Sequence, residues 1–252
     1  MEDFLFLFFF AFVAGFIDSV VGGGGLIQLP ALLIFVPGIP VATIMGTNKF
    51  AALSGTALSA SRYIKLTKIT WNAVLPAIFS AFLFSLIGAR VISYLDKELV
   101  KPLVFFLLII VAVYTFFKKD FGIHHLPKLK ERKTFIYSLI MGAVLGFYDG
   151  FFGPGTGSFL MVAFISVFGF NFLNASASAK VINCVTNLSA LIYFIYTGQI
   201  NMTIAVPLAA FNMLGSWIGT KMAIQKGSAF VRVLFLIIVS GMILKFGYDI
   251  FN

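Results

Sequence analysis

The sequence predicts an all-α integral membrane protein made of two inverted-topology repeats. Its 252 residues are 60% hydrophobic and only 11% charged, and the mean hydropathy is +1.04. Soluble domains carry roughly a quarter charged residues, so this composition indicates a chain that lies in a bilayer. The apolar residues form long spans, as membrane helices require, rather than the short alternating segments of a β-barrel.

Ten apolar segments, separated by polar residues, Pro or Gly, are expected to be helical. They cover residues 4–21, 26–36, 41–60, 71–93, 101–117, 135–152, 156–170, 174–197, 202–222 and 230–250. Because about 20 residues cross a bilayer as a helix, segments 26–36 and 156–170 are short and either cross or re-enter. The first segment lacks the basic start of a cleaved signal, and we expect it to be retained.

A motif near the start of the chain occurs a second time. The stretch GFIDSVVGGGGL from Gly15 matches GFYDGFFGPGTG from Gly146, and the same 131-residue offset pairs Lys49 with Lys180. The match extends without a gap to Gly88 and Gly219. We therefore predict two homologous membrane repeats of about five segments each, residues 1–117 and 134–252, joined by a basic linker at 118–133.

The distribution of basic residues favours an inverted second repeat. Inversion places 12 basic loop residues on the linker's side of the membrane and 3 on the other, whereas a parallel arrangement gives 9 and 6. Since Lys and Arg accumulate in cytoplasmic loops, we expect the linker to be cytoplasmic and both termini to lie outside. His124 and His125 in the linker have no further metal ligand nearby and are expected to be solvated.

The two glycine-rich stretches interrupt apolar sequence at the start of each repeat. Inverted repeats with Gly- or Pro-broken helices are typical of secondary transporters, whose sites lie where the broken helices meet. A helix that restarts after such a break exposes unpaired N–H groups and the positive end of its dipole, which suit an anion. We expect the two helix starts to face each other; the alternative is that the glycines only permit close packing.

Lys49 and Lys180 lie within apolar segments, where a charged side chain is costly and indicates function by default. Asp18 and Asp149 each precede a glycine break by four residues. Two interpretations stay open. The lysines and helix starts bind an anion while a carboxylate carries a coupling proton or cation, or the four charges neutralise one another as structural ion pairs.

The predicted substrate-binding residues are Gly22, Gly23, Gly24, Gly25, Gln28, Asn48, Lys49, Gly153, Gly155, Thr156, Gly157, Lys180 and Asn183. Asp18 and Asp149 are predicted to form the coupling group or the structural ion pairs. We expect no catalytic residue, metal site or cofactor, because the spans lack the His, Cys and Glu clusters that such chemistry needs. The net charge of +9 is assigned mostly to membrane orientation, not to nucleic-acid binding.

Four stretches of the chain resemble the TauE/SafE family, the sulfite exporter or 4-toluene sulfonate uptake permeases. They are GFIDSVVGGGGLIQLPALL, GTNKFAA, GFYDGFFGPGTGSF and the segment that contains Lys180. The chain is most similar to the YfcA-like branch. The resemblance implies a bacterial inner-membrane permease, since some members move sulfite or sulfonated organic anions. It places the family's paired motifs on Asp18 with Gly22 to Gly25, Asn48 with Lys49, Asp149 with Gly153 and Gly155, and Lys180 with Asn183.

The sequence thus predicts a secondary-active permease that moves small anions, of the sulfite or organosulfonate type, by alternating access. The expected partners are the small anion, a coupling proton or cation, and the lipid bilayer. An anion channel and a metal or cation permease remain as alternatives, and a membrane-embedded enzyme is disfavoured. The transported anion, the direction of transport and the oligomeric state are not predicted.

Overall fold

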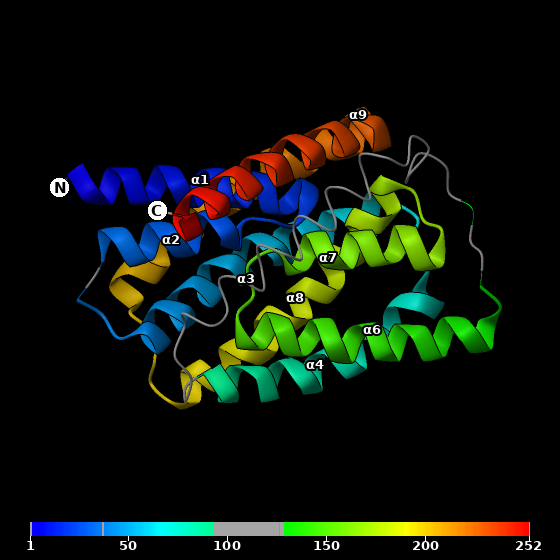
Figure 1. The fold of residues 1–252 in the computed structure, drawn as a ribbon, viewed down its shortest axis with the longest axis horizontal. Helices are drawn as coiled ribbons and strands as arrows, with labels where there is room; N and C mark the ends of the chain where they lie inside the picture. Colours follow the sequence, from blue (N-terminus) through cyan, green and yellow to red (C-terminus); the bar gives the residue numbers. More distant parts are fainter. Residues whose placement is uncertain (1, 37, 93–125, 127–128, 252) are drawn as a thin grey trace.

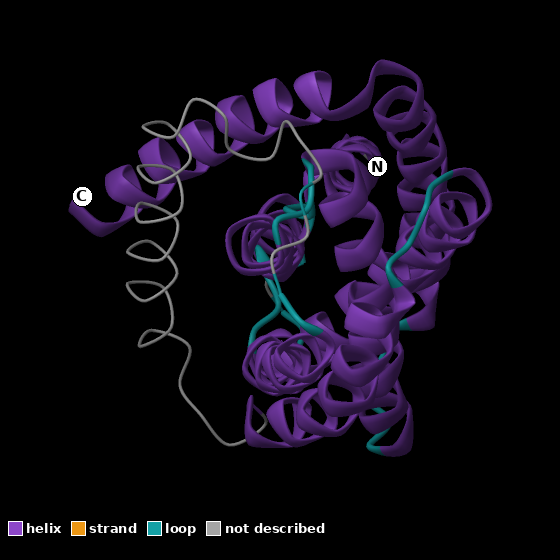
Figure 2. Cartoon of the chain, turned by 90° about the vertical axis from the view of Figure 1, so that its right-hand side faces the viewer, coloured by secondary structure: helices purple, strands orange, loops and turns teal. Residues whose placement is uncertain are grey.

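The computed structural model describes residues 2–36, 38–92, 126 and 129–251, and every regular element in these ranges is a helix (Figures 1 and 2). The elements are α1 (Glu2–Val21), α2 (Gly25–Phe35), α3 (Val41–Leu66), α4 (Trp71–Ile92), α6 (Glu131–Phe151), α7 (Thr156–Ala163), the π-helix η2 (Phe164–Phe168), α8 (Phe172–Tyr196) and α9 (Met202–Phe251). The expected segment 101–117 lies outside the described residues.

The helix ends lie near the predicted ones, with two differences. Helix α3 continues to Leu66, beyond the expected end at 60, because Ser61 and Arg62 lower the hydropathy without breaking the helix. Glu131–Lys133, expected in the linker, form the first turn of α6. The last two expected segments agree with the two helices that make up α9, which meet at Gly227, where φ is 70° and the backbone is not helical.

Four described helices are long and apolar enough to cross a membrane: Trp71–Ile92, Glu131–Phe151, Phe172–Tyr196 and Met202–Gly227. Large apolar side chains on their surfaces are exposed, for example Phe79 at 66% and Val144 at 60%. Such surfaces are suited to lipid rather than water. The protein is therefore a multi-pass helical membrane protein.

The helices pack in a pattern that follows the 131-residue offset. Helix α1 lies along α9, and its counterpart α6 lies along α4, the counterpart of the first part of α9 (Figure 1). At these contacts Gly15 packs directly against the backbone of Asn212, and Gly146 packs against the backbone of Ala81, so that a Cβ at either glycine would collide with the other helix. Helices α3 and α8, which also correspond, pack against each other. Each half thus places its first helix on the other half, and glycine permits the close approach.

Candidate functional site

Both glycine-rich stretches break the chain between two helices. Helix α1 ends at Val21, Gly22 takes a φ of 78°, and α2 begins at Gly25. In the second half, α6 ends at Phe151, and the turn that precedes α7 contains Gly153 and Gly155, with φ of 92° and 84°. These left-handed conformations strain residues that carry a Cβ, which explains why glycine occupies them.

The two breaks contact each other through their backbones. Ser158 donates two hydrogen bonds to the first break, from its N–H to Gly22 O (3.1 Å) and from Oγ to Val21 O (2.8 Å). A Cβ on Gly22 would collide with the backbone of Gly157, and one on Gly25 would lie 3.2 Å from Pro154 Cα. The starts of α2 and α7 are therefore held against each other.

The start of α2 has unused hydrogen-bond donors. Gly22 N donates to Asp18 O, and Leu26 N donates to Gly23 O. The N–H groups of Gly23, Gly24 and Gly25 have no acceptor within the described part of the chain. A helix start of this kind carries a partial positive charge.

Lys49, on α3, reaches the second break. Its Nζ donates to Asp149 Oδ2 at 2.8 Å, and the two side chains are 4% and 3% exposed. A Cβ on Gly153 would lie 3.0 Å from the same Nζ. The ammonium group therefore lies beside the turn between α6 and α7, with a carboxylate of the other half as its counter-ion.

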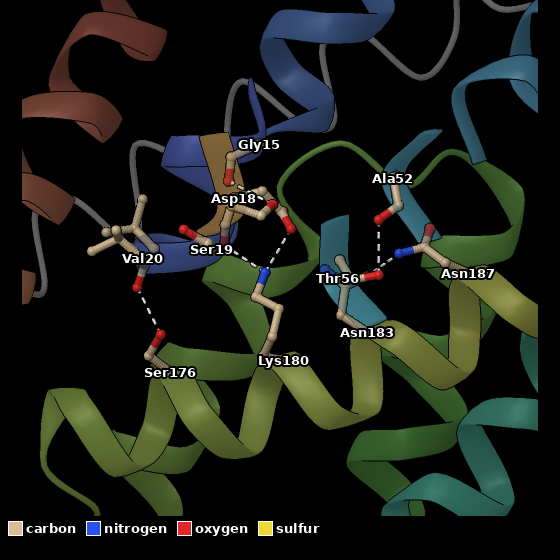
Figure 3. Close-up of polar contacts among 12 residues, drawn as sticks. Gly15, Asp18, Ser19, Val20, Ala52, Thr56, Ser176, Lys180, Asn183 and Asn187 are labelled. Atoms are coloured by element: carbon tan, nitrogen blue, oxygen red, sulfur yellow. Dashed lines mark hydrogen bonds and ion pairs between the residues drawn. The ribbon is translucent and has the colours of Figure 1, made fainter. Parts of the chain in front are cut away.

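Lys180, on α8, reaches the first break in the corresponding way (Figure 3). Its Nζ lies 2.6 Å from Asp18 Oδ2 and also donates to the backbone oxygen of Asp18. The two side chains are 2% and 14% exposed. Each lysine thus pairs with the aspartate of the opposite half, and the four charges sum to zero.

Three further predicted residues differ in how completely their polar groups are paired. Gln28 is 1% exposed; its Oε1 accepts from Asn212 Nδ2 at 2.7 Å, and Nε2 has no partner among the described residues. Asn48 is 7% exposed, and its Oδ1 likewise has no partner in the described ranges. Thr156 Oγ1 instead donates to Gly153 O at 2.7 Å.

Asn183 lies on α8 beyond Lys180, and its Oδ1 accepts from Asn187 Nδ2 at 2.9 Å (Figure 3). The structure thus groups the predicted residues around the two breaks and their ion pairs, while the amides of Gln28 and Asn183 engage neighbouring amides. It leaves the roles of all these residues in binding as predictions.

Sequence reasoning missed three side chains that hold the breaks in place. Ser176 Oγ donates to Val20 O at 2.7 Å, and Tyr63 Oη donates to Ser19 O at 2.9 Å. Asn212 is the third, through its bond to Gln28. A polar residue inside the apolar segment 202–222 was the signal for Asn212, whose counterpart in the first half is Ala81.

Comparison with known proteins finds similar sequences among probable membrane transporters of bacteria. The family described as Sulfite exporter TauE/SafE matches residues 7–246. A probable membrane transporter protein of Haemophilus influenzae is 38% identical over 245 residues, which cover 96% of this chain and 94% of that protein. The probable membrane transporter protein YfcA of Escherichia coli K12 is 33% identical, with 96% and 89% covered. No solved structure matches the chain.

Proposed function

Because the chain belongs to the sulfite exporter TauE/SafE family of membrane transporters, we propose that it is a secondary-active permease for small anions of the sulfite or organosulfonate type. The relatives carry the name of probable membrane transporters. The substrate class and the mechanism of this chain are argued from its own residues.

The observation that carries the proposal is the position of the two buried lysines at the glycine breaks. Lys49 Nζ lies beside Gly153, and Lys180 Nζ lies against Asp18, whose backbone oxygen also accepts from Gly22 N. The start of α2 adds N–H donors that have no acceptor in the described ranges. Ammonium groups and free backbone N–H groups in a water-poor setting favour an anion.

We assign anion binding first to Lys49. An ammonium has three donors, and within the described residues Lys49 uses one of them, toward Asp149. Gly153 has no side chain, which allows Nζ to lie against its backbone, since a Cβ there would be 3.0 Å from Nζ. The unpaired Nε2 of Gln28 and the N–H groups of Gly23 to Gly25 are further donors of the proposed site.

We propose alternating access between two inverted repeats, residues 1–117 and 134–252. Both ion pairs join the halves, so all four charges lie where one half would move against the other. The reciprocal contacts of α1 with α9 and of α6 with α4 support a two-fold relation. We further propose that the basic linker 118–133 lies in the cytoplasm and that both termini lie outside, in a bacterial inner membrane.

A cation permease is less well supported. Each carboxylate at the breaks already has a lysine within 2.8 Å, and the described residues contain no group of three or more His, Cys, Asp or Glu side chains that could hold a metal ion. A cation would have to displace an ammonium group at either aspartate. An anion instead finds positive groups that retain unused donors.

Thermal unfolding of the purified protein with a panel of ligands tests the proposed function. Sulfite, sulfate, thiosulfate, sulfoacetate, phosphate, lactate and divalent cations are compared. A ligand present at about 100 times its Kd adds roughly 2.7 kcal/mol of stability. We expect a shift with a sulfur anion that Lys49→Met loses and that Lys65→Met, an exposed lysine on the same helix, retains. A shift with cations alone, or an anion shift retained by Lys49→Met, contradicts the proposal.

A further inference from the structure

The charges at the two breaks balance before any ligand binds. Lys49, Lys180, Asp149 and Asp18 carry two positive and two negative charges, and none of the four side chains is more than 14% exposed. An anion that entered alone would leave this group with a net negative charge. In a water-poor environment an uncompensated charge is strongly unfavourable, so a positive charge has to enter with the anion.

The two ion pairs are not equivalent. Lys180 Nζ holds the carboxylate and the backbone oxygen of Asp18, a residue with a 14% exposed side chain. Within the described part of the chain, Lys49 Nζ hydrogen-bonds only to the carboxylate of Asp149, whose side chain is 3% exposed. If Lys49 turns to an anion, Asp149 loses its counter-ion while it stays buried. A buried carboxylate without a counter-ion favours its protonated form.

Few other titratable groups face Asp149. On its own helix, the neighbouring Tyr148 donates its hydroxyl to Pro154 O. Helix α4 contributes only Arg90, which is exposed, and α7 contributes none. On α8, Lys180 is held by Asp18 and Cys184 is partly buried. Among the described elements packed on α6, no further cation replaces Lys49.

We propose that the anion loads together with a proton and that Asp149 is the proton acceptor. This inference rests on the proposed function. Lys49 Nζ leaves Asp149 Oδ2 and binds the anion, and the freed carboxylate takes a proton from the aqueous compartment to which the site is open. When the anion leaves on the other side, the Asp149 O–H bond breaks, the proton enters that compartment, and the ion pair forms again.

Charge balance then fixes the stoichiometry. A monoanion moves with one proton, so its transport is electroneutral and responds to a pH gradient, not to membrane potential. Asp18 keeps its lysine throughout and binds no transported proton. The pair Lys180–Asp18 is the fixed contact, and the pair Lys49–Asp149 is the one that opens.

Transport by the full-length protein in liposomes tests the inference with sulfite and with methanesulfonate, a monoanion that stays ionised across the pH range used. An internal dye reports proton entry, and valinomycin with potassium sets the membrane potential. We expect the lumen to acidify as methanesulfonate enters, and the rate of entry to be unaffected by the potential. Entry of the anion without acidification, at a rate that follows the potential, overturns the inference and leaves the proposed function intact.

If neither anion enters faster than into protein-free liposomes, the proposed function itself fails. Two variants identify the proton acceptor. Asp149→Asn is expected to lose proton entry. Asp18→Asn is expected to keep the wild-type ratio of protons to anions, even if its rate of anion transport changes. The reverse result overturns the assignment. A measurement on wild-type protein in weakly buffered detergent is independent of variant folding: methanesulfonate binding should take up one proton per anion, and no uptake overturns the inference.

Discussion

Lys49 Nζ lies 2.8 Å from Asp149 Oδ2, and the two residues belong to different halves of the chain. Lys180, in the second half, forms the corresponding ion pair with Asp18, in the first half. Each half therefore supplies the cation for one glycine break and the carboxylate for the other. The stability of the fold and the proposed transport both depend on these pairs.

Removal of one partner of the Lys49–Asp149 pair should destabilise the fold more than removal of both partners. We expect Lys49→Met to lower the free energy of unfolding by about 3–5 kcal/mol, because it leaves a buried carboxylate unpaired. The double variant Lys49→Met/Asp149→Asn should recover most of that loss. Thermal or denaturant unfolding in detergent measures both, with Lys65→Met as the control. A double variant no more stable than the single one would contradict this account.

Gly22→Ala should disrupt the contact between the two breaks. The added Cβ would collide with Gly157, and Gly22 has a φ of 78°. The left-handed conformation alone costs an L-residue about 1–2 kcal/mol. We expect a lower unfolding temperature and a lower yield of monodisperse protein. Gly38→Ala is the control, since a Cβ there meets nothing within 4 Å. Equal unfolding temperatures and yields for the two variants would show that the contact between the two breaks does not stabilise the fold.

The features that the sequence predicted are those with a local signal. Glycines inside apolar sequence located the breaks, and the internal repeat singled out Lys49 and Lys180. Mutual neutralisation of the four charges was one of the two interpretations of the sequence. The partner of each lysine was not predictable, because Lys49 and Asp149 are 100 residues apart and Lys180 and Asp18 are 162 apart. Local periodicity carries no information about such contacts, which arise only when the two halves pack.

The same reason explains why Asn212 was missed. Its partner Gln28 is 184 residues away, and its counterpart in the first half is an alanine. The 131-residue offset predicts which positions correspond, but it does not predict polar contacts that only one half makes. The sequence alone therefore did not show that Asn212 pairs with Gln28 Oε1 and that Nε2 of Gln28 has no partner among the described residues.

Asn212→Ala should destabilise the protein through Gln28. The substitution removes the donor to Gln28 Oε1 and leaves a second buried amide atom unpaired, which costs about 1–3 kcal/mol. Unfolding of the two single variants and of Gln28→Leu/Asn212→Ala gives the coupling energy. Asn72→Ala, at an exposed position on α4, is the control. Additive effects of Gln28→Leu and Asn212→Ala would argue against a coupled pair.

Tyr63→Phe should have a smaller effect. Tyr63 is fully buried and donates to Ser19 O at 2.9 Å, so loss of the hydroxyl is expected to cost about 1 kcal/mol. The ring itself should be tolerated, because phenylalanine occupies the corresponding position 194. Thermal unfolding of Tyr63→Phe is compared with that of the control Tyr196→Phe, whose side chain is 89% exposed. No difference between the two variants would mean that the bond to Ser19 O does not stabilise the break.

Counterflow in liposomes tests most directly the central claim that the Lys49 site carries an anion by alternating access. Liposomes that contain the full-length protein are preloaded with unlabelled sulfite and diluted into a trace of radiolabelled sulfite. A carrier exchanges the two and accumulates label transiently above its equilibrium level, whereas a channel lets the label equilibrate without an overshoot. We predict an overshoot for the wild type and for Lys65→Met, and its loss in Lys49→Met/Asp149→Asn. Equilibration of the wild type without an overshoot, or an undiminished overshoot in the double variant, would contradict the account.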